Sequence, residues 1–185
     1  MLILASESPR RKELLAQTVE KFEIRSADVE EITAAADPFL VPEINARTKA
    51  GRVAQANPGA LVIGADTVII FENRVIGKPR DIDDAARILA EFSGKIHYTV
   101  TGVSLRRTGN EPVDISFREI SEVKFKTLDS TVIASYLNKV NVLDKAGAYA
   151  LQEHGDMIIE YFTGEENNII GLPTSKLKKL LQELL

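Results

Sequence analysis

Ala60-Leu-Val-Ile-Gly-Ala-Asp-Thr-Val-Ile-Ile-Phe71 is the stretch of sequence that decides the fold. Its apolar residues are mostly leucine, valine and isoleucine, which predicts a strand over 60–71. Asn57-Pro58-Gly59 stands before it and ends a helix that we expect over 43–56. Glu72-Asn73 follows as a turn into a short strand at 74–76, so the stretch predicts a β-hairpin entered from a helix.

Strands and helices also alternate along the rest of the chain. We expect the other strands at 2–6, 22–27, 97–105, 113–125 and 157–162. We expect further helices after the capping positions Ser8, Asp81 or Asp83, and Asp129 or Ser130, and a last helix from Pro173. The acidic segment 30–42 predicts a loop. Strands mixed with helices and hairpins favour an α/β fold with a mixed sheet, in one domain over 1–185.

The bulk composition limits the classes of function. Of the 185 residues, 44% are apolar, enough for a sizeable core, and the net charge is −4 with a pI near 5.3. Such a chain has no overall field for nucleic acid or an acidic membrane, so an anionic ligand needs a local cluster of positive groups. The absence of cysteine excludes disulfides, thiolate metal sites and cysteine nucleophiles. With no signal-peptide pattern and no long apolar run, we expect a soluble cytoplasmic protein that binds neither nucleic acid nor membrane.

Three basic residues stand where a helix begins, in Ser8-Pro9-Arg10-Arg11-Lys12. The first turn of a helix carries partial positive charge, so basic side chains are unfavourable there unless an anion is bound. Backbone N–H groups and two guanidinium groups together would hold a phosphate. The alternative is a solvated basic turn that pairs with nearby acids.

A carboxylate interrupts the apolar strand at Gly64-Ala65-Asp66-Thr67. A buried unpaired charge is costly, so Asp66 needs a cation, a metal ion or a cleft. The alternative is an aspartate that caps a turn at a strand end. Gly77-Lys78-Pro79 is a weaker candidate, and it lacks the spacing of a Walker A loop. Glu31 and Lys49 are weaker still from the residues alone, because acidic loop pairs and helix lysines are mostly solvated.

Several motifs in order resemble the Maf family. They are Leu2-Ile-Leu-Ala-Ser-Glu-Ser-Pro-Arg-Arg-Lys-Glu-Leu-Leu15, Gly64-Ala-Asp-Thr-Val68, Gly77-Lys-Pro79, Asp144-Lys-Ala-Gly-Ala-Tyr-Ala-Leu-Gln152 and Asn168-Ile-Ile-Gly-Leu-Pro173. The resemblance covers the whole chain. It implies an elongated mixed sheet flanked by helices, with two lobes and a cleft, similar to inosine triphosphate pyrophosphatases. It also implies hydrolysis of a nucleoside triphosphate between the α- and β-phosphates with Mg²⁺ or Mn²⁺, and a homodimer is possible.

The resemblance also implies roles for particular residues. The catalytic acid falls on Asp66, and Asp66 with Glu31 would bind the metal. The phosphate-binding positions of the family fall on Ser8, Arg10, Arg11, Lys49 and Lys78. We therefore expect these basic side chains to converge on Asp66, with the polyphosphate and the metal ion between them.

The family divides by substrate at three positions. Arg10, Thr67 and Gln152 follow the branch that acts on dTTP and UTP, whereas the other branch acts on 7-methyl-GTP and has an aromatic residue and a glutamine in place of the first two. Thr67 and Gln152 would contact the base edge. The turn Glu153-His154-Gly155 departs from the family pattern. The alternatives are a pyrophosphatase for 7-methyl-GTP or another modified nucleotide, and a nucleotide-binding regulator of cell division with little catalysis.

Overall fold

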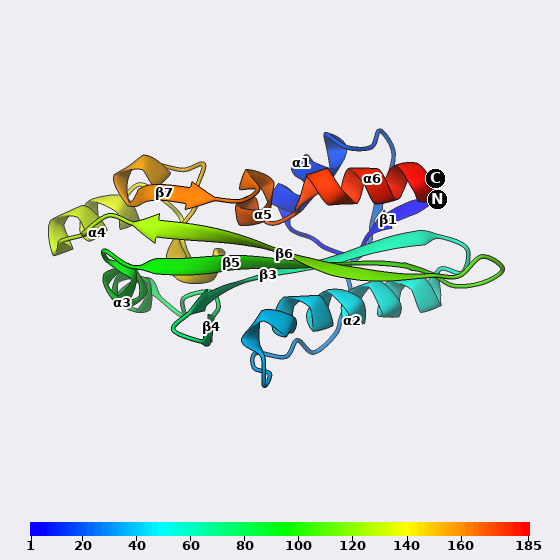
Figure 1. Ribbon diagram of the computed structural model, residues 1–185, viewed down its shortest axis with the longest axis horizontal. Coiled ribbons are helices and arrows are strands. Elements are labelled where there is room, and N and C mark those ends of the chain that lie inside the picture. Colours follow the sequence, from blue (N-terminus) through cyan, green and yellow to red (C-terminus); the bar gives the residue numbers. More distant parts are fainter.

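A seven-stranded mixed sheet runs the length of the molecule (Figure 1), and the computed structural model describes all 185 residues of it. The strand order is β2-β1-β3-β5-β6-β7, with β4 paired to β3, and only the β1 pairings are parallel. The strands are β1 (Leu2–Leu4), β2 (Glu23–Ile24), β3 (Leu61–Phe71), β4 (Arg74–Ile76), β5 (Ile96–Arg107), β6 (Val113–Phe125) and β7 (Ile159–Thr163). The expected mixed α/β sheet is confirmed.

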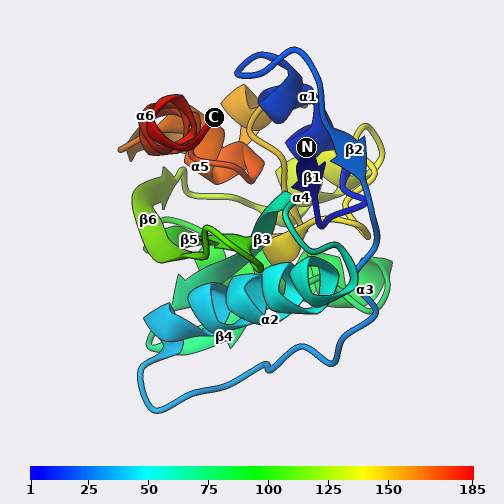
Figure 2. The same cartoon turned by 90° about the vertical axis from the view of Figure 1, so that its right-hand side faces the viewer.

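The helices cover both faces of this sheet. Figure 2 shows α2 on one side and α1, α5 and α6 on the other. The helices are α1 (Pro9–Ala16), α2 (Val41–Ala56), α3 (Ile82–Phe92), α4 (Ser130–Leu137), α5 (Glu166–Ile170) and α6 (Thr174–Leu184), with 3₁₀ turns η1 (Pro38–Leu40), η2 (Ala146–Ala148) and η3 (Gly155–Met157). None of these helices combines the length and the apolar character that a membrane span requires.

Several elements differ from the sequence-based prediction, most of them by a few residues at their ends. Helix α2 begins at Val41 rather than 43, because Pro42 fits the first turn of a helix, where no N–H is needed. Helix α3 begins at Ile82, and its N-cap is Asp81, one of the two predicted capping residues, whose carboxylate accepts a hydrogen bond from the backbone N–H of Asp84. The strand predicted at 22–27 is reduced to two residues at the sheet edge. The short helix α5 was not predicted.

Two glycines let α2 lie directly against the sheet. A Cβ atom at Gly64 would overlap the backbone of α2 at Ala46, and a Cβ atom at Gly102 would overlap it at Pro42. The backbone that approaches Gly64 so closely is that of a helix of the protein itself. This close packing carries α2 side chains to the centre of β3.

One edge of β3 is open in its middle. Strand β1 pairs with residues 61–63 and β4 pairs with residues 69–71. Because backbone groups alternate between the two edges of a strand, the N–H and C=O of Ala65 and Thr67 point toward the gap between β1 and β4. No turn, loop or side-chain hydrogen bond reaches these backbone groups. The open edge, defined as residues 64–68 of β3 between β1 and β4, has no strand partner, and Asp66, Thr67 and Val68 of it line a cavity.

Candidate active site

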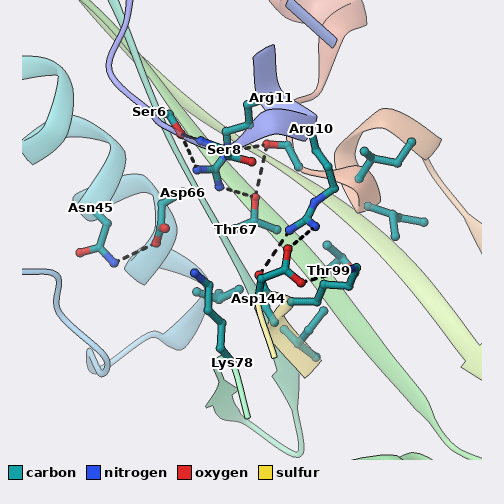
Figure 3. A pocket seen from close by; sticks show the side chains of 18 of the residues that line it. Ser6, Ser8, Arg10, Arg11, Asn45, Asp66, Thr67, Lys78, Thr99 and Asp144 are labelled. Carbon is teal, nitrogen blue, oxygen red and sulfur yellow. Dashed lines mark hydrogen bonds and ion pairs between the residues drawn. The ribbon is translucent and has the colours of Figure 1, made fainter. Parts of the chain in front are cut away.

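A cavity of about 740 Å³ lies beside the open edge. Its walls come from the start of α1, the acidic loop before α2, α2 itself, β3, the end of the β3–β4 hairpin and the segment 144–153. All the predicted site residues line it: Ser8, Arg10, Arg11, Glu31, Lys49, Asp66, Thr67, Lys78 and Gln152. Residues from six parts of the chain thus meet around one strand, and Figure 3 shows most of the labelled side chains gathered there.

Asp66 forms the centre of a buried polar cluster on the α2 face of β3. Its Oδ1 accepts a hydrogen bond from the Lys49 ammonium at 3.0 Å, and its Oδ2 accepts one from the Asn45 amide at 2.9 Å. Lys49 also lies 2.8 Å from Oε1 of Glu31. Asp66 and Lys49 are both buried, so the lysine neutralises the aspartate within the fold. Asn45 also bonds both backbone groups of Ile32, which holds the acidic loop against α2.

Arg11 lies on the opposite face of β3, where alternate residues of the strand point. Its guanidinium donates to the Thr67 hydroxyl at 3.0 Å, to the Gly171 carbonyl at 2.9 Å and to the Ser6 hydroxyl at 3.2 Å. Burial lowers the pKa of Arg11, against the negative charges of Asp66 and Glu31, which raise it. The three hydrogen bonds hold the positively charged guanidinium in a fixed position beside the cavity.

Arg10 reaches across the cavity to the segment 144–153. Its guanidinium donates to the Asp144 carboxylate at 3.0 Å and to the Asp144 carbonyl at 3.4 Å (Figure 3). The other carboxylate oxygen of Asp144 accepts from the Lys145 ammonium at 2.9 Å. Partial burial alone would raise the pKa of Asp144, but the hydrogen bonds and charges of Lys145 and Arg10 lower it overall. The Lys145 ammonium also lies 3.3 Å from the carboxylate of Glu153. Glu153 belongs to the turn that departs from the family pattern, so this departure adds an ion pair to the segment 144–153.

Ser8 and Lys78 line the cavity without a side-chain partner in the protein. Ser8 precedes α1 as predicted, yet its hydroxyl caps no backbone N–H. Lys78 forms no salt bridge, and Figure 3 shows its side chain extending toward the space between Asp66 and Asp144. A hydroxyl and an ammonium group left without partners in a polar cavity are available to an anionic ligand.

The two residues predicted for base choice differ in their surroundings. The Thr67 hydroxyl accepts from Arg11 and lies 2.9 Å from the Thr101 hydroxyl. Since Thr101 donates its proton to the Asn168 carbonyl, Thr67 is the donor toward Thr101, and its hydroxyl also lies 3.4 Å from the Gly171 carbonyl. The Gln152 side chain is exposed at the rim of the cavity and makes no hydrogen bond within the protein.

Sequence reasoning missed Asn45, Asp144 and Lys145 as members of the site. Asn45 is a polar residue within a helix and has no local signal. Asp144 and Lys145 belong to a stretch that resembles the family, but nothing in their spacing indicates that they face Arg10, which is 134 positions away. Their buried or paired state is visible only in three dimensions.

Curated relatives match this chain over nearly its whole length. The dTTP/UTP pyrophosphatase of Akkermansia muciniphila is 41% identical over 185 residues, covering 99% of this chain and 96% of the relative. The dTTP/UTP pyrophosphatase of Clostridioides difficile is 40% identical, covering 98% of this chain and 94% of the relative. That of Aquifex aeolicus is 41% identical, covering 99% and 95%.

Solved structures share the fold. The Ham1 protein of Staphylococcus aureus aligns with a TM-score of 0.58 at 14% identity, covering 100% of this chain and 99% of that chain. A Ham1 protein from Coxiella burnetii gives the same TM-score and identity and covers 98% of each chain. These likenesses confirm the expected fold class.

The family model of Maf-like proteins matches residues 1–184. With this match and the identity to the curated relatives, the chain belongs to the Maf family.

Proposed function

We propose that this protein hydrolyses dTTP and UTP to the nucleoside monophosphate and pyrophosphate, by attack of water on the α-phosphate. The single observation that carries the proposal is the meeting, in one cavity around the open edge of β3, of the buried Asp66 cluster with the basic groups of α1, α2 and the β3–β4 hairpin. The names of the curated relatives support the choice of nucleotide.

The residues present fit a divalent cation. Asp66 and Glu31 both bind the Lys49 ammonium, so a positive charge already lies between the two carboxylates. The protein offers no cluster of three histidine or acidic ligands. Mg²⁺ commonly binds one or two carboxylates and completes its shell with phosphate oxygens and water, so Asp66 and Glu31 would hold Mg²⁺ or Mn²⁺ together with the substrate. When bound, the ion would draw charge from the phosphate oxygens.

The basic residues would hold the triphosphate. The Ser8 hydroxyl and the Arg10, Arg11, Lys49 and Lys78 side chains would bind phosphate oxygens and neutralise the charge that develops on the pyrophosphate leaving group. Arg11 is held by three hydrogen bonds, so it would require little reorganisation on binding.

Asp66 would act on the attacking water. Its carboxylate would accept the proton or orient the water for in-line attack. Asn45 and Lys49 fix both carboxylate oxygens, so the direction of the carboxylate is set before substrate arrives. Lys49 would have to share or leave its contact with Asp66 when the carboxylate takes up this role.

The base would lie on the Thr67 face. Gln152, at the rim, both donates and accepts hydrogen bonds and would contact the base edge. Thr67 would influence base choice through the guanidinium of Arg11, which it binds. Arg10 would connect the phosphates to the segment that carries Gln152, through its pair with Asp144.

The test is pyrophosphate release from the common and modified nucleoside triphosphates, with Mg²⁺ and with a chelator. We expect dTTP and UTP to be hydrolysed most efficiently, and only with the metal ion. Asp66→Asn should lose at least about a hundredfold in turnover while its far-ultraviolet circular dichroism stays unchanged. Gln152→Ala should mainly relax base choice. Binding of dTTP without pyrophosphate release would support the regulatory alternative instead.

A further inference from the structure

A hydrogen-bonded chain of three side chains ends at the cavity and has no part in the chemistry described above. It begins at His97 on β5, passes through Tyr149 in the segment 144–153 and ends at Thr99 on β5. Nε2 of His97 lies 3.0 Å from the Tyr149 hydroxyl, and that hydroxyl lies 3.2 Å from the Thr99 hydroxyl. All three residues are buried, and both Tyr149 and Thr99 line the cavity.

The positions of the protons in this chain follow from the surroundings of His97. Its Nδ1 is buried with no hydrogen-bond partner, while Phe92 stacks on the ring at 4.4 Å between centroids. Burial lowers the pKa of His97 to about 3, so the ring is neutral and carries one N–H. Buried N–H groups without an acceptor are rarer than acceptors without a donor, so the proton belongs on Nε2, which has the Tyr149 oxygen as its acceptor.

The direction of the remaining hydrogen bonds is then determined. The Tyr149 oxygen accepts from His97, so the Tyr149 hydroxyl donates to Thr99, which is its only other partner. Burial raises the pKa of Tyr149, which keeps the phenol protonated. The Thr99 oxygen therefore accepts from Tyr149, and its own proton has no acceptor in the protein. The Thr99 hydroxyl is left as a donor at the cavity wall.

The surroundings of Thr99 suit a base better than a phosphate. Thr99 pairs in register with Ile69 of β3, and its carbonyl accepts a hydrogen bond from Asn168, next to Ile169. Ile69, Ile169 and the Tyr149 ring all line the cavity, which gives this part of the wall an apolar surface. A flat ring fits between apolar walls with one polar group that fixes its orientation.

We propose that Thr99 is a specificity-determining residue that donates a hydrogen bond to a carbonyl oxygen of the pyrimidine base, and that His97 and Tyr149 are positioning residues that make Thr99 a donor. This inference rests on the proposed function. Uracil and thymine carry a carbonyl at position 4, where cytosine carries an amino group. A donor facing the carbonyl gains a hydrogen bond, whereas a donor facing the amino group leaves both donors unpaired, which disfavours cytosine nucleotides.

The experiment compares kcat/KM for UTP and CTP in the wild type and in three variants. Thr99→Val keeps the shape and removes the hydroxyl, Thr99→Ser keeps the hydroxyl, and Tyr149→Phe removes only the group that directs it. Thr99→Val should lose about tenfold or more with UTP and little with CTP. Thr99→Ser should keep a preference close to that of the wild type.

Tyr149→Phe tests the direction of the hydrogen bond between the Tyr149 and Thr99 hydroxyls. Without the tyrosine proton, the Thr99 oxygen is free to accept from an amino group, so CTP should gain and the UTP preference should fall by about fivefold or more. An equal loss with both nucleotides in Thr99→Val would give Thr99 a structural role and overturn the proposal. An unchanged preference in Tyr149→Phe would overturn the role of the chain. Failure of the wild type to hydrolyse UTP or dTTP would count against the proposed function itself.

Discussion

The ammonium of Lys49 lies 3.0 Å from the carboxylate of Asp66, and the two side chains are both buried. Lys49 has a second charged partner, whereas Asp66 has only a neutral one besides Lys49. Lys49 retains an ion pair with Glu31 if Asp66 is neutralised, whereas Asp66 retains only the Asn45 amide if Lys49 is removed. This asymmetry predicts that replacing Lys49 lowers the stability of the protein more than replacing Asp66.

Lys49→Met should destabilise the protein by about 3 kcal/mol, because it leaves a buried carboxylate without a counter-charge. Asp66→Asn should cost less, about 1–2 kcal/mol: Lys49 keeps its ion pair with Glu31, and the loss comes from the amide NH2, which faces a donor where the carboxylate accepted a hydrogen bond. Urea unfolding at pH 7.5 measures both. Equal losses would mean that the Asp66 carboxylate is solvated more than its position indicates.

Asp144→Asn tests the pair that spans the cavity. Both partners are partly exposed, with side chains 32% and 50% accessible for Arg10 and Asp144, so the loss of stability should stay below about 1 kcal/mol. We expect KM for UTP to rise about threefold to tenfold, because Arg10 would no longer be held beside the phosphates. Glu153→Gln is the matched control, since it also removes a negative partner of Lys145 but leaves Arg10 paired. A rise of the same size in the control would remove Arg10 from the explanation.

Gly64→Ala should destabilise the protein by about 3 kcal/mol, because the added methyl group would push α2 away from β3. Turnover should fall as well, since α2 carries Asn45 and Lys49 to Asp66. Gly51→Ala is the control within helix α2. Its added methyl group meets no atom within 4 Å, so this variant should stabilise the protein by up to about 1 kcal/mol. Thermal unfolding of the two variants against the wild type gives the comparison, and a mild effect at Gly64 would contradict the close packing.

His97 predicts a pH dependence of stability. Burial lowers its pKa to about 3, whereas an unfolded histidine titrates near pH 6.5. Between these values the unfolded chain binds a proton that the folded protein does not, so this contribution to stability is complete above about pH 6.5 and is lost as the pH falls toward 3. In this range the wild type should lose about 1.4 kcal/mol per pH unit more than His97→Gln. Parallel profiles from urea unfolding at pH 7 and pH 5 would contradict the buried neutral state.

The residues that could be predicted from sequence are those that violate a local rule. Asp66 stands in an apolar strand and Arg10 and Arg11 stand at a helix start, so each required a partner that the sequence did not supply nearby. The mixed sheet followed from strand and helix patterns. Helix α5 could not be predicted, because its five residues are separated from strand β7 by only two residues and are too few for a periodic pattern.

The contacts that could not be predicted depend on distant segments. Asn45 reaches Asp66 only because Gly64 and Gly102 allow α2 to approach the sheet, and neither glycine specifies which helix residue will face the strand. Thr99 looked like one polar residue of an alternating strand. Its importance depends on Tyr149, which comes 50 positions later.

The gap between β1 and β4 has a further consequence for how this protein can be altered. The amide groups of Ala65 and Thr67 belong to the main chain, so exchanging their side chains does not delete them. A contact that a nucleotide makes with the backbone of Thr67, which lines the cavity, would survive every side-chain exchange there except one to proline, which removes the N–H. Mutational scanning would overlook it, and replacing an amide with an ester linkage would reveal it.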